Sequence, residues 1–551
     1  MNAKTSPYIY TLFFILYTSS LSAQDLELKI SFNESDNFGV LKKINFQKKH
    51  LDSLSIYDEI NKVSKRFKKL GYFTNSINKV IKKGNQFTAR FILGKKITEV
   101  VIRKKKRETL EFIGLKNNTI PIDDLESTLN KISEELESEG ETFSKVNLTN
   151  LKITKNKLIA DLIIVKSKKR KINKTFIKGY KFFPKSFVNH YFKINKNTIY
   201  NHNKIKEISN KSKLLNFIEE IKPPETLFKK DSTLLYLYLS KKQNNSFDGL
   251  INFTTTENNN VLFNGHLDLK LSNILNKGEE FELFWNSLGL EKQEFNIHST
   301  IPYIFNSNLT TSLSFNIYKQ DSTFLNTKFK TNIAYNINSK SKVSLTFSNE
   351  TSKNLRRNTN QSNVEKFENY FVGVEYSHIT PKSDNFNNKK FSIIINPSFG
   401  KRNSNGNTIN QIKVELSTSY NWDLNNRSNI FIKNKTGYLK SDNLLENELF
   451  RIGGFKSIRG FNEQSIFTKN YSLFNIEYRY TTSTTSYFYT ITDLARATTN
   501  TKTTNLIGLG AGYLFKIKNS QINLSTAIGK TTTSNFNLKN SKLAINWKTF
   551  F

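Results

Sequence analysis

Two different periodicities divide the chain, and the change falls near residue 245. Before this point, apolar residues recur three and four positions apart, as in Ile56, Ile60, Val63 and Phe67. Residues at this spacing lie on one face of a helix, so the stretch predicts an amphipathic helix between strand-like segments. After this point, apolar and polar residues alternate along segments of about ten residues, which is typical of strands with two different faces. The sequence therefore predicts an α+β part followed by an all-β part.

The α+β part repeats one arrangement three times: a strand, a helix and two further strands. Gly71 and Gly140 each follow a predicted helix, where a glycine commonly ends the helical conformation. In the third repeat we expect a helix that begins at Pro184 and a strand over residues 215–221. The three predicted modules cover residues 24–94, 95–167 and 168–245.

The all-β part, residues 246–551, contains sixteen alternating segments joined as hairpins. An even number of antiparallel strands can close into a barrel, which pairs every backbone group of a sheet that spans a membrane. A soluble β-sandwich also alternates, so it remains an alternative. The predicted strands begin near Phe247, Val261, Glu279, Glu291, Asn308, Phe324, Lys340, Lys366, Lys389, Asn410, Arg427, Lys469, Thr485, Thr504, Ser520 and Lys542.

The first 23 residues have the order of a secretory signal. Lys4 precedes an apolar run over residues 8–17, and small residues lead to Ala23, near which we expect cleavage. A membrane anchor is the alternative, but the run is shorter than the ~20 residues that a spanning helix needs. The chain is therefore predicted to be exported, and an exported chain with this strand pattern is predicted to close in an outer membrane.

The residues that carry most enzyme chemistry are scarce or scattered. The chain has no cysteine, which excludes disulfides, thiolate metal sites and thiol nucleophiles. Its six histidines do not occur at metal-ligand spacing. We find no nucleophile elbow, phosphate-binding glycine loop or paired-carboxylate signature. The sequence predicts no enzyme activity, no metal site and no cofactor.

A formal net charge of +37 raises the question of an anionic partner. Such a charge would ordinarily suggest nucleic acid. An exported protein meets little nucleic acid, so we expect lipid headgroups, acidic chains or no specific anionic partner. A soluble protein that binds polyanions is a further alternative, although it leaves the signal and the alternating strands unexplained.

Residues 451–461, late in the chain, form the most distinctive loop. Gly453, Gly454 and Gly460 allow backbone conformations that other residues avoid, so a shaped turn is expected. Arg459 lies among them and offers five donors in a rigid fork that suits a carboxylate. Taken alone, the loop could also be an ordinary solvated turn.

With the sixteen strands and three modules, this loop resembles the long sixth extracellular loop of the outer-membrane assembly superfamily. That superfamily contains assembly factors of the BamA and TamA type and two-partner secretion transporters. Residues 269–279 resemble its second strand with a Gly-Glu turn, and residues 301–305 resemble its turn entry, in which a Pro precedes a hydrophobic residue and a Phe. The resemblance implies α+β periplasmic POTRA repeats followed by an all-β 16-stranded antiparallel transmembrane barrel in the bacterial outer membrane.

The resemblance also implies roles for individual residues. In the superfamily the tip of this loop folds back into the barrel lumen, where its Arg binds carboxylates on the wall. Ile491 and Ala495 replace a Phe and a Gly of the superfamily pattern, and Thr549 replaces an apolar residue. The implied loop latch is Gly453, Gly454, Arg459, Gly460 and Phe461, its lumen-wall partners are Glu477 and Asp493, and the C-terminal barrel signal is Trp547 and Phe551.

By the same resemblance, the protein would capture unfolded outer-membrane protein clients with its POTRA modules and insert them at the barrel seam. The main alternative is a two-partner-type secretion channel that exports one dedicated protein. Three modules without a plug helix favour assembly, and the modules disfavour a passive porin. The implied partners are clients, outer-membrane lipid and accessory proteins of the periplasm or inner membrane, without nucleic acid.

Overall fold

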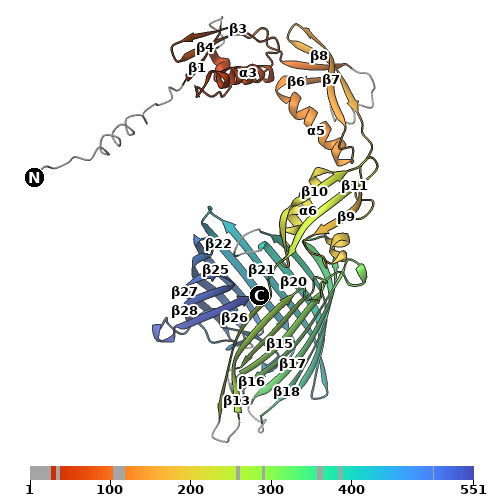
Figure 1. The fold of residues 1–551 in the computed structure, drawn as a ribbon. Helices are drawn as coiled ribbons and strands as arrows, with labels where there is room; N and C mark the ends of the chain where they lie inside the picture. Colours follow the sequence, from red (N-terminus) through yellow and green to blue (C-terminus); the bar gives the residue numbers. More distant parts are fainter. Residues whose placement is uncertain are drawn as a thin grey trace, which may run out of the picture. The chain divides into compact units, whose positions relative to one another are not determined.

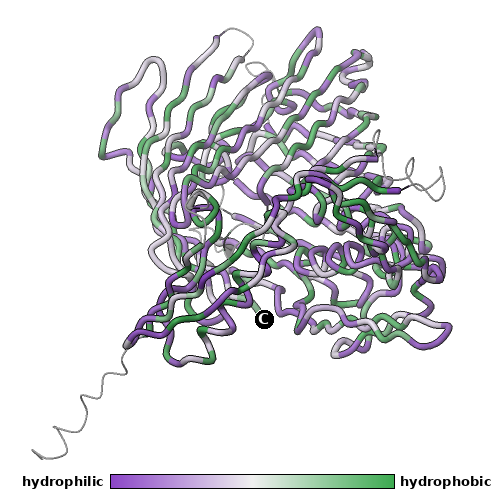
Figure 2. The backbone as a smooth tube through the Cα atoms, turned by 90° about the horizontal axis from the view of Figure 1, so that it is seen from above, coloured by the Kyte–Doolittle hydropathy of each residue, from purple (hydrophilic) through white to green (hydrophobic). Residues whose placement is uncertain are grey.

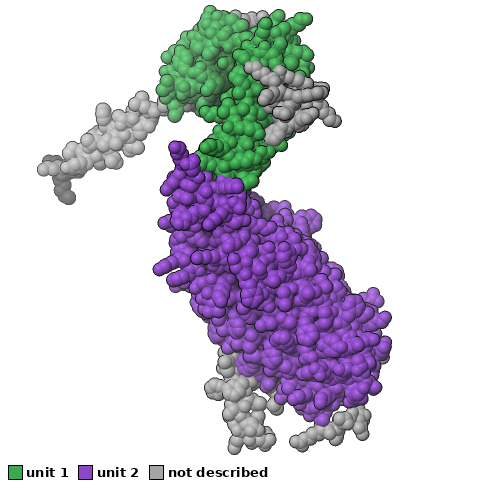
Figure 3. All heavy atoms as spheres, turned by 90° about the vertical axis from the view of Figure 1, so that its right-hand side faces the viewer, with its two compact units in different colours: residues 1–170, 199–201 green, residues 171–198, 202–551 purple. Residues whose placement is uncertain are grey.

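The computed structural model divides the chain into two compact units. The first comprises residues 1–170 and 199–201, and the second comprises residues 171–198 and 202–551 (Figure 3). The signal predicted at residues 1–23 lies outside the described residues. The structure describes residues 26–32, 38–103, 118–255, 261–287, 292–356, 364–382, 386, 389–499 and 502–551.

The first module packs one long and one short helix on a four-stranded sheet. Its elements are β1 (Leu26–Phe32), α2 (Phe38–Leu41), β2 (Lys49–His50), α3 (Ser53–Lys69), β3 (Ser76–Lys83) and β4 (Gln86–Ile92), with sheet order β2-β1-β4-β3. The apolar face of α3 is buried against Leu28 and Phe91 of the sheet. Asp52 caps the helix by accepting a hydrogen bond from Ser55 N. Gly71 ends it with a φ of 94°.

The second module repeats this topology. Its elements are β5 (Glu99–Arg103), β6 (Thr119–Pro121), η2 (Ile122–Asp124), α5 (Leu125–Ser138), β7 (Lys145–Thr154) and β8 (Lys157–Val165). The sheet order is β6-β5-β8-β7, and β5 pairs parallel with β8 as β1 does with β4. The first two modules therefore contain the same four-stranded sheet, and the first strand of each module is an interior strand of that sheet.

The third module differs from its prediction in two elements. Its elements are β9 (Ile172–Lys178), η3 (Phe187–Tyr191), α6 (His202–Ser212), β10 (Ile218–Phe228) and β11 (Thr233–Lys241). The helix expected from Pro184 is only the short π-turn η3, which ends before Lys193 at a φ of 55°. The strand expected over 215–221 is the longer β10. It includes Pro223 and Pro224, which an edge strand tolerates.

Sixteen antiparallel strands close into a barrel (Figure 1). Each predicted strand start lies within three residues of the observed one, and the sandwich alternative is wrong. The strands are β12 (Ser246–Thr255), β13 (Val261–Ser272), β14 (Glu280–Ser287), β15 (Lys292–Ile301), β16 (Leu309–Gln320), β17 (Phe324–Asn336), β18 (Ser341–Asn354), β19 (Phe367–Pro381), β20 (Lys389–Ser404), β21 (Asn407–Asp423), β22 (Ser428–Lys440), β25 (Asn470–Ser483), β26 (Ser486–Thr498), β27 (Thr503–Ile517), β28 (Ser520–Thr531) and β29 (Lys542–Phe550).

The two faces of the barrel wall have opposite chemistry. Hydrophilic and hydrophobic residues alternate along its strands (Figure 2). Leu543, Ile545 and Trp547 of β29 are exposed on the outer face, whereas Arg402 and Asp493 are buried on the inner face. Apolar residues that face outward and charges that face inward suit a barrel surrounded by lipid. Among the described residues, no helix is long and apolar enough to cross a membrane.

The two ends of the barrel carry different connections. We call the end with connections 273–279 and 302–308 the module end, because the third module contacts both of them. The opposite, loop end carries the long connection 441–469 between β22 and β25. The strand alternation therefore places this loop and the third module at opposite ends of the barrel.

Candidate functional site

The long loop folds into the barrel lumen and packs on the inner wall. It contains η5 (Glu446–Glu448) and a hairpin of β23 (Phe450–Ile452) with β24 (Ile466–Thr468). Ile452 and Ile458 of the loop are buried in one cluster with Leu473 of β25 and Leu506 of β27. Apolar burial thus holds the loop against β25–β27 and brings its polar tip to the same wall.

Arg459 binds both predicted carboxylates. Its Nε donates to Asp493 Oδ2 at 2.8 Å, and its Nη2 donates to Asp493 Oδ1 at 2.7 Å. Its Nη1 donates to Glu477 Oε1 at 2.6 Å, and its backbone N donates to Asp493 Oδ2 at 2.8 Å. The Arg459 residue is 8% exposed and Asp493 is 0% exposed. The bidentate fork therefore fixes both the position and the orientation of the loop tip.

A second cation completes the charge balance at this site. The other oxygen of Glu477 accepts from Arg479 Nε at 2.8 Å and forms an ion pair with Arg479 Nη2 at 2.6 Å. The Arg479 guanidinium also lies 4.1 Å from the ring centroid of Phe431. Two guanidinium groups and two carboxylates thus share one buried network. Such burial is tolerable only when each charge is paired and hydrogen-bonded.

Glycines on both surfaces allow the tip to approach the wall. Gly453, Gly454 and Gly460 have φ values of 119°, 92° and 90°. A Cβ on Gly460 would overlap the backbone of residues 528–529, and a Cβ on Gly508 of β27 would overlap the Arg459 carbonyl. Phe461 packs beside Gly529, at the edge of the same cluster. Sequence reasoning named the loop glycines but missed Gly508 and Gly529, because glycines in a strand carry no motif.

The first and last barrel strands are joined by few backbone pairs. Along the described residues, β12 and β29 pair at Ser246–Phe550 and Phe247–Thr549, both at the module end. By contrast, β28 and β29 pair continuously over residues 520–527 of β28. We call the β12–β29 junction the seam. The barrel is therefore closed, but this junction is its least paired one.

Comparison with known proteins gives matches in structure. No protein-family model and no curated protein matches the sequence. CdiB from Acinetobacter baumannii matches with a TM-score of 0.52 at 13% identity, over 83% of this chain and 90% of that chain. CdiB from Escherichia coli gives 0.49 at 12% identity, over 89% and 98% of the chains. BamA from Haemophilus ducreyi lacking POTRA domains 1–3 gives 0.47 at 11% identity, over 83% and 100%.

The chain shares the fold of CdiB from Acinetobacter baumannii. The fold class inferred from the sequence is thereby confirmed: α+β modules precede a closed sixteen-stranded antiparallel barrel. At this low identity the similarity concerns the fold.

Side chains also cross the seam. Asn546 of β29 donates through Nδ2 to Asp248 Oδ2 of β12 at 2.7 Å. The other oxygen of Asp248 is hydrogen-bonded to His266 Nε2 of β13 at 2.9 Å. A lumen cavity of about 500 Å³ lies between these residues and the loop tip. We call Asp248 and Asn546 the seam clasp, because they join strands that share few backbone pairs.

The loop tip also reaches the wall on the other side of the seam. Gln464 Nε2 donates to Glu294 Oε2 of β15 at 2.6 Å, and Lys292 Nζ donates to the Glu463 carbonyl at 3.0 Å. The Arg451 guanidinium lies 3.8 Å from the ring centroid of Tyr318 on β16. The loop therefore contacts strands from both ends of the barrel sequence. No motif marks these partners.

The predicted C-terminal residues lie at the seam, away from the Arg459 network. Trp547 is exposed on the outer face of β29. Phe551 donates its backbone N–H to the Asn245 carbonyl at 2.9 Å, next to the first strand of the barrel. The last residue therefore extends the seam pairing at the module end.

The two stretches 269–279 and 301–305, which carried part of the resemblance, meet the third module. Tyr180 donates its hydroxyl to Asn276 Oδ1 at 2.6 Å and accepts from Asn273 Nδ2 at 2.7 Å. The Phe187 ring packs edge-on against Tyr303, with 5.0 Å between the centroids. The third module therefore packs on the barrel through these two turns.

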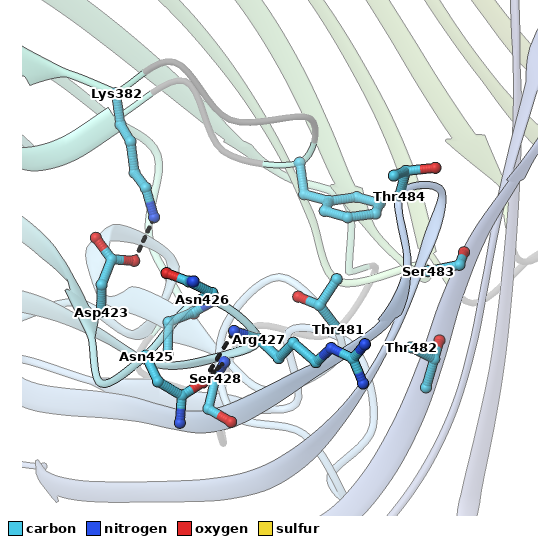
Figure 4. Close-up of a pocket in the computed structure, with 12 residues that line it drawn as sticks. Lys382, Asp423, Asn425, Asn426, Arg427, Ser428, Thr481, Thr482, Ser483 and Thr484 are labelled. Carbon is cyan, nitrogen blue, oxygen red and sulfur yellow. Dashed lines mark hydrogen bonds and ion pairs between the residues drawn. The ribbon is translucent and has the colours of Figure 1, made fainter. Parts of the chain in front are cut away.

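A cavity of about 820 Å³ opens at the module end (Figure 4). Lys382 Nζ donates to Asp423 Oδ1 at 2.5 Å on one side of it. The Arg427 side chain extends from the turn that follows Asp423 toward Thr481 and Thr482. Apart from Phe386, the lining residues are polar or charged. Among the described residues, no group of three His, Asp or Glu side chains is arranged to hold a metal ion.

Proposed function

We propose that this protein assembles or inserts other β-barrel proteins in the outer membrane, with its modules in the periplasm. The seam carries the proposal. Beyond Ser246–Phe550 and Phe247–Thr549, the described parts of β12 and β29 share no further backbone pairs. Unpaired strand edges are templates for another strand. A client strand can therefore add to this edge while the rest of the barrel stays closed.

The modules supply edges for capture of unfolded outer-membrane protein clients. Strands β3, β7 and β10 each stand at the edge of their sheet. An extended client segment can add to such an edge by main-chain hydrogen bonds, which do not depend on its sequence. The outer face of the barrel contacts outer-membrane lipid, and accessory proteins of the periplasm or inner membrane are further partners. The free energy of client folding drives insertion without nucleotide or cofactor.

The loop has a positioning role in this proposal. Arg459 holds it to β25 and β26, and Gln464 holds it to β15. These strands lie on the two sides of the seam, so the loop braces the lumen beside the place where a client enters. Gly453, Gly454, Gly460 and Phe461 shape the tip, and Glu477 and Asp493 are its partners on the wall.

A disulfide lock tests the proposal directly. The chain has no cysteine, so a Phe247→Cys/Thr549→Cys pair introduces the only thiols, on paired positions of the seam. The locked protein is reconstituted in lipid vesicles, and insertion of a urea-unfolded client barrel is followed by protease protection. We expect insertion to be lost under oxidation and restored by reduction. The matched control, Leu345→Cys/Val374→Cys, links paired outward-facing positions of β18 and β19, where a lock is expected to be harmless.

The same lock separates assembly from secretion. Full client insertion by the oxidised seam variant would exclude insertion at the seam. A channel that exports one dedicated protein through the lumen would keep its export with the seam locked. It would lose export when the loop tip is cross-linked to the wall, because the loop fills the path.

A further inference from the structure

A second buried ion pair holds the entry limb of the loop, residues 441–449. Glu448 in η5 pairs with Arg402 Nη1 of β20, and each side chain is 2% exposed. The same carboxylate accepts from Leu445 N at 2.8 Å and from Gln411 Nε2 of β21 at 2.8 Å. The entry limb is thus fixed to two strands that do not touch Arg459.

Asn447 extends this contact to two more strands. Its Nδ2 donates to Ser352 Oγ of β18 at 2.6 Å and to the Glu365 carbonyl at 2.7 Å. Its own carbonyl accepts from Asn326 Nδ2 of β17 at 2.6 Å. Asn447 and Leu445 are both 0% exposed. The limb therefore has a dry, specific binding surface on β17–β21.

A buried ion pair is a weak source of net stability, because desolvation offsets the attraction. Here Arg402 Nε is buried and has no hydrogen-bond partner among the described residues, so the pair is not arranged for greatest stability. Removal of one member would nevertheless leave an uncompensated buried charge. The pair therefore favours one position of the entry limb, because any other position would leave a buried charge unpaired.

We propose that Arg402 and Glu448 are positioning residues that anchor the base of the loop independently of Arg459. The two anchors lie on different strands, β20 with β21 and β25 with β26, separated by β22. Gly453 and Gly454 lie between Glu448 and Arg459 and have positive φ. Release of the tip then moves the hairpin of β23 and β24 about a fixed base. This deepens the proposed function, and its consequence for client insertion rests on that function.

Hydrogen exchange on the full-length protein in lipid nanodiscs tests the inference. We expect Glu448→Gln to accelerate exchange in residues 441–449 by about tenfold and to leave residues 457–461 within about twofold of wild type. Arg459→Ala should do the reverse. In the double variant Arg402→Gln/Glu448→Gln no buried charge is left unpaired. Its limb should exchange more slowly than in either single variant, a coupling that mere loss of contacts would not produce.

The matched control is Glu375→Gln, which breaks the lumen ion pair with Lys330 at 3.5 Å, away from the loop. Barrel folding is checked for every variant by heat-modifiable mobility. If Glu448→Gln does not fold, Asn447→Ala is measured in the same way. Unchanged limb exchange in the folded variants, or joint release of limb and tip, would overturn the inference. Failure of the proposed function would appear separately, as absence of client insertion by the wild-type protein.

Discussion

The guanidinium of Arg459 binds both oxygens of Asp493, at 2.7 and 2.8 Å, and the Arg459 backbone N–H binds the second of them as well. Asp493 therefore accepts three of the four hydrogen bonds that Arg459 donates to the wall, and Glu477 accepts one. Asp493, whose neighbours Ile491 and Ala495 depart from the superfamily pattern, thus makes more hydrogen bonds to Arg459 than Glu477 does. This follows from register, because Asp493 lies opposite Gly508, against which the tip packs.

Replacement of Arg459 should destabilise the barrel strongly. Arg459→Ala leaves Asp493 buried without its cation, which typically costs about 3–5 kcal/mol. Arg459→Lys keeps the charge but loses the fork, so it should rescue only part of the loss. The measurement is the denaturant midpoint of the reconstituted barrel. Arg496→Ala, which removes an exposed cation from the strand that carries Asp493, is the control, and an equal effect there would contradict the assignment.

Three glycine variants should separate close approach from backbone strain. At Gly508 a Cβ would overlap the Arg459 carbonyl without positive φ, and at Gly406 φ is +79° but the space is open. Gly460 combines both features. We expect Gly508→Ala and Gly460→Ala to accelerate exchange at residues 457–461. Gly406→Ala should cost about 1 kcal/mol through strain alone and leave the loop protected. If residues 457–461 stay protected in Gly508→Ala, the barrel wall shifts enough to accommodate the added Cβ.

Loss of the seam clasp should make the seam open more often. Asn546→Ala removes the hydrogen bond to Asp248 Oδ2, and few backbone pairs remain to compensate. Hydrogen exchange of the amides that pair β12 with β29 should accelerate by roughly three- to tenfold, because exchange proceeds through the open seam and the closed state loses a hydrogen bond of about 1 kcal/mol. His298→Ala, which removes a hydrogen bond to Ser314 between β15 and β16, is the control. Equal rates in both variants would argue that the clasp is incidental.

The first module should lose stability in acid through Glu59. Burial opposes ionisation of this carboxylate, but hydrogen bonds from Arg66 and Gln47 outweigh it and hold the pKa of Glu59 below its ordinary value. A lowered folded pKa stabilises the module above the unfolded pKa, and this contribution is lost as pH falls through the folded pKa. Protection of α3, corrected for intrinsic exchange, should therefore fall below about pH 5.

Glu59→Gln should lower this protection at neutral pH and flatten its acid dependence. Glu126→Gln, which breaks an exposed pair with Lys69, should change neither. A persistent acid dependence in Glu59→Gln would assign the effect to another carboxylate.

Most of the fold was visible in the sequence because alternation and helical spacing are local. The starts of β13, β17 and β29 at Val261, Phe324 and Lys542 were predicted without error, since a charge or turn residue breaks the pattern there. Local patterns failed where tertiary contacts decide. β21 begins at Asn407 and not at Asn410, because a tight turn at residues 405–406 lets pairing with β20 continue to its end.

The sequence by itself determined the modules, the strands and the loop with its Arg459, because each is encoded within a short stretch of the chain. Only the tertiary structure decided which strands the loop binds besides those that carry Glu477 and Asp493. Glu448 meets Arg402 across 46 residues of sequence, and Gln464 meets Glu294 across 170. Closure of the barrel brings these side chains to face one another across the lumen. A buried polar group needs a hydrogen-bond partner, and closure of the barrel determines which residue lies near enough to be that partner. The spacing of residues along the chain does not predict it.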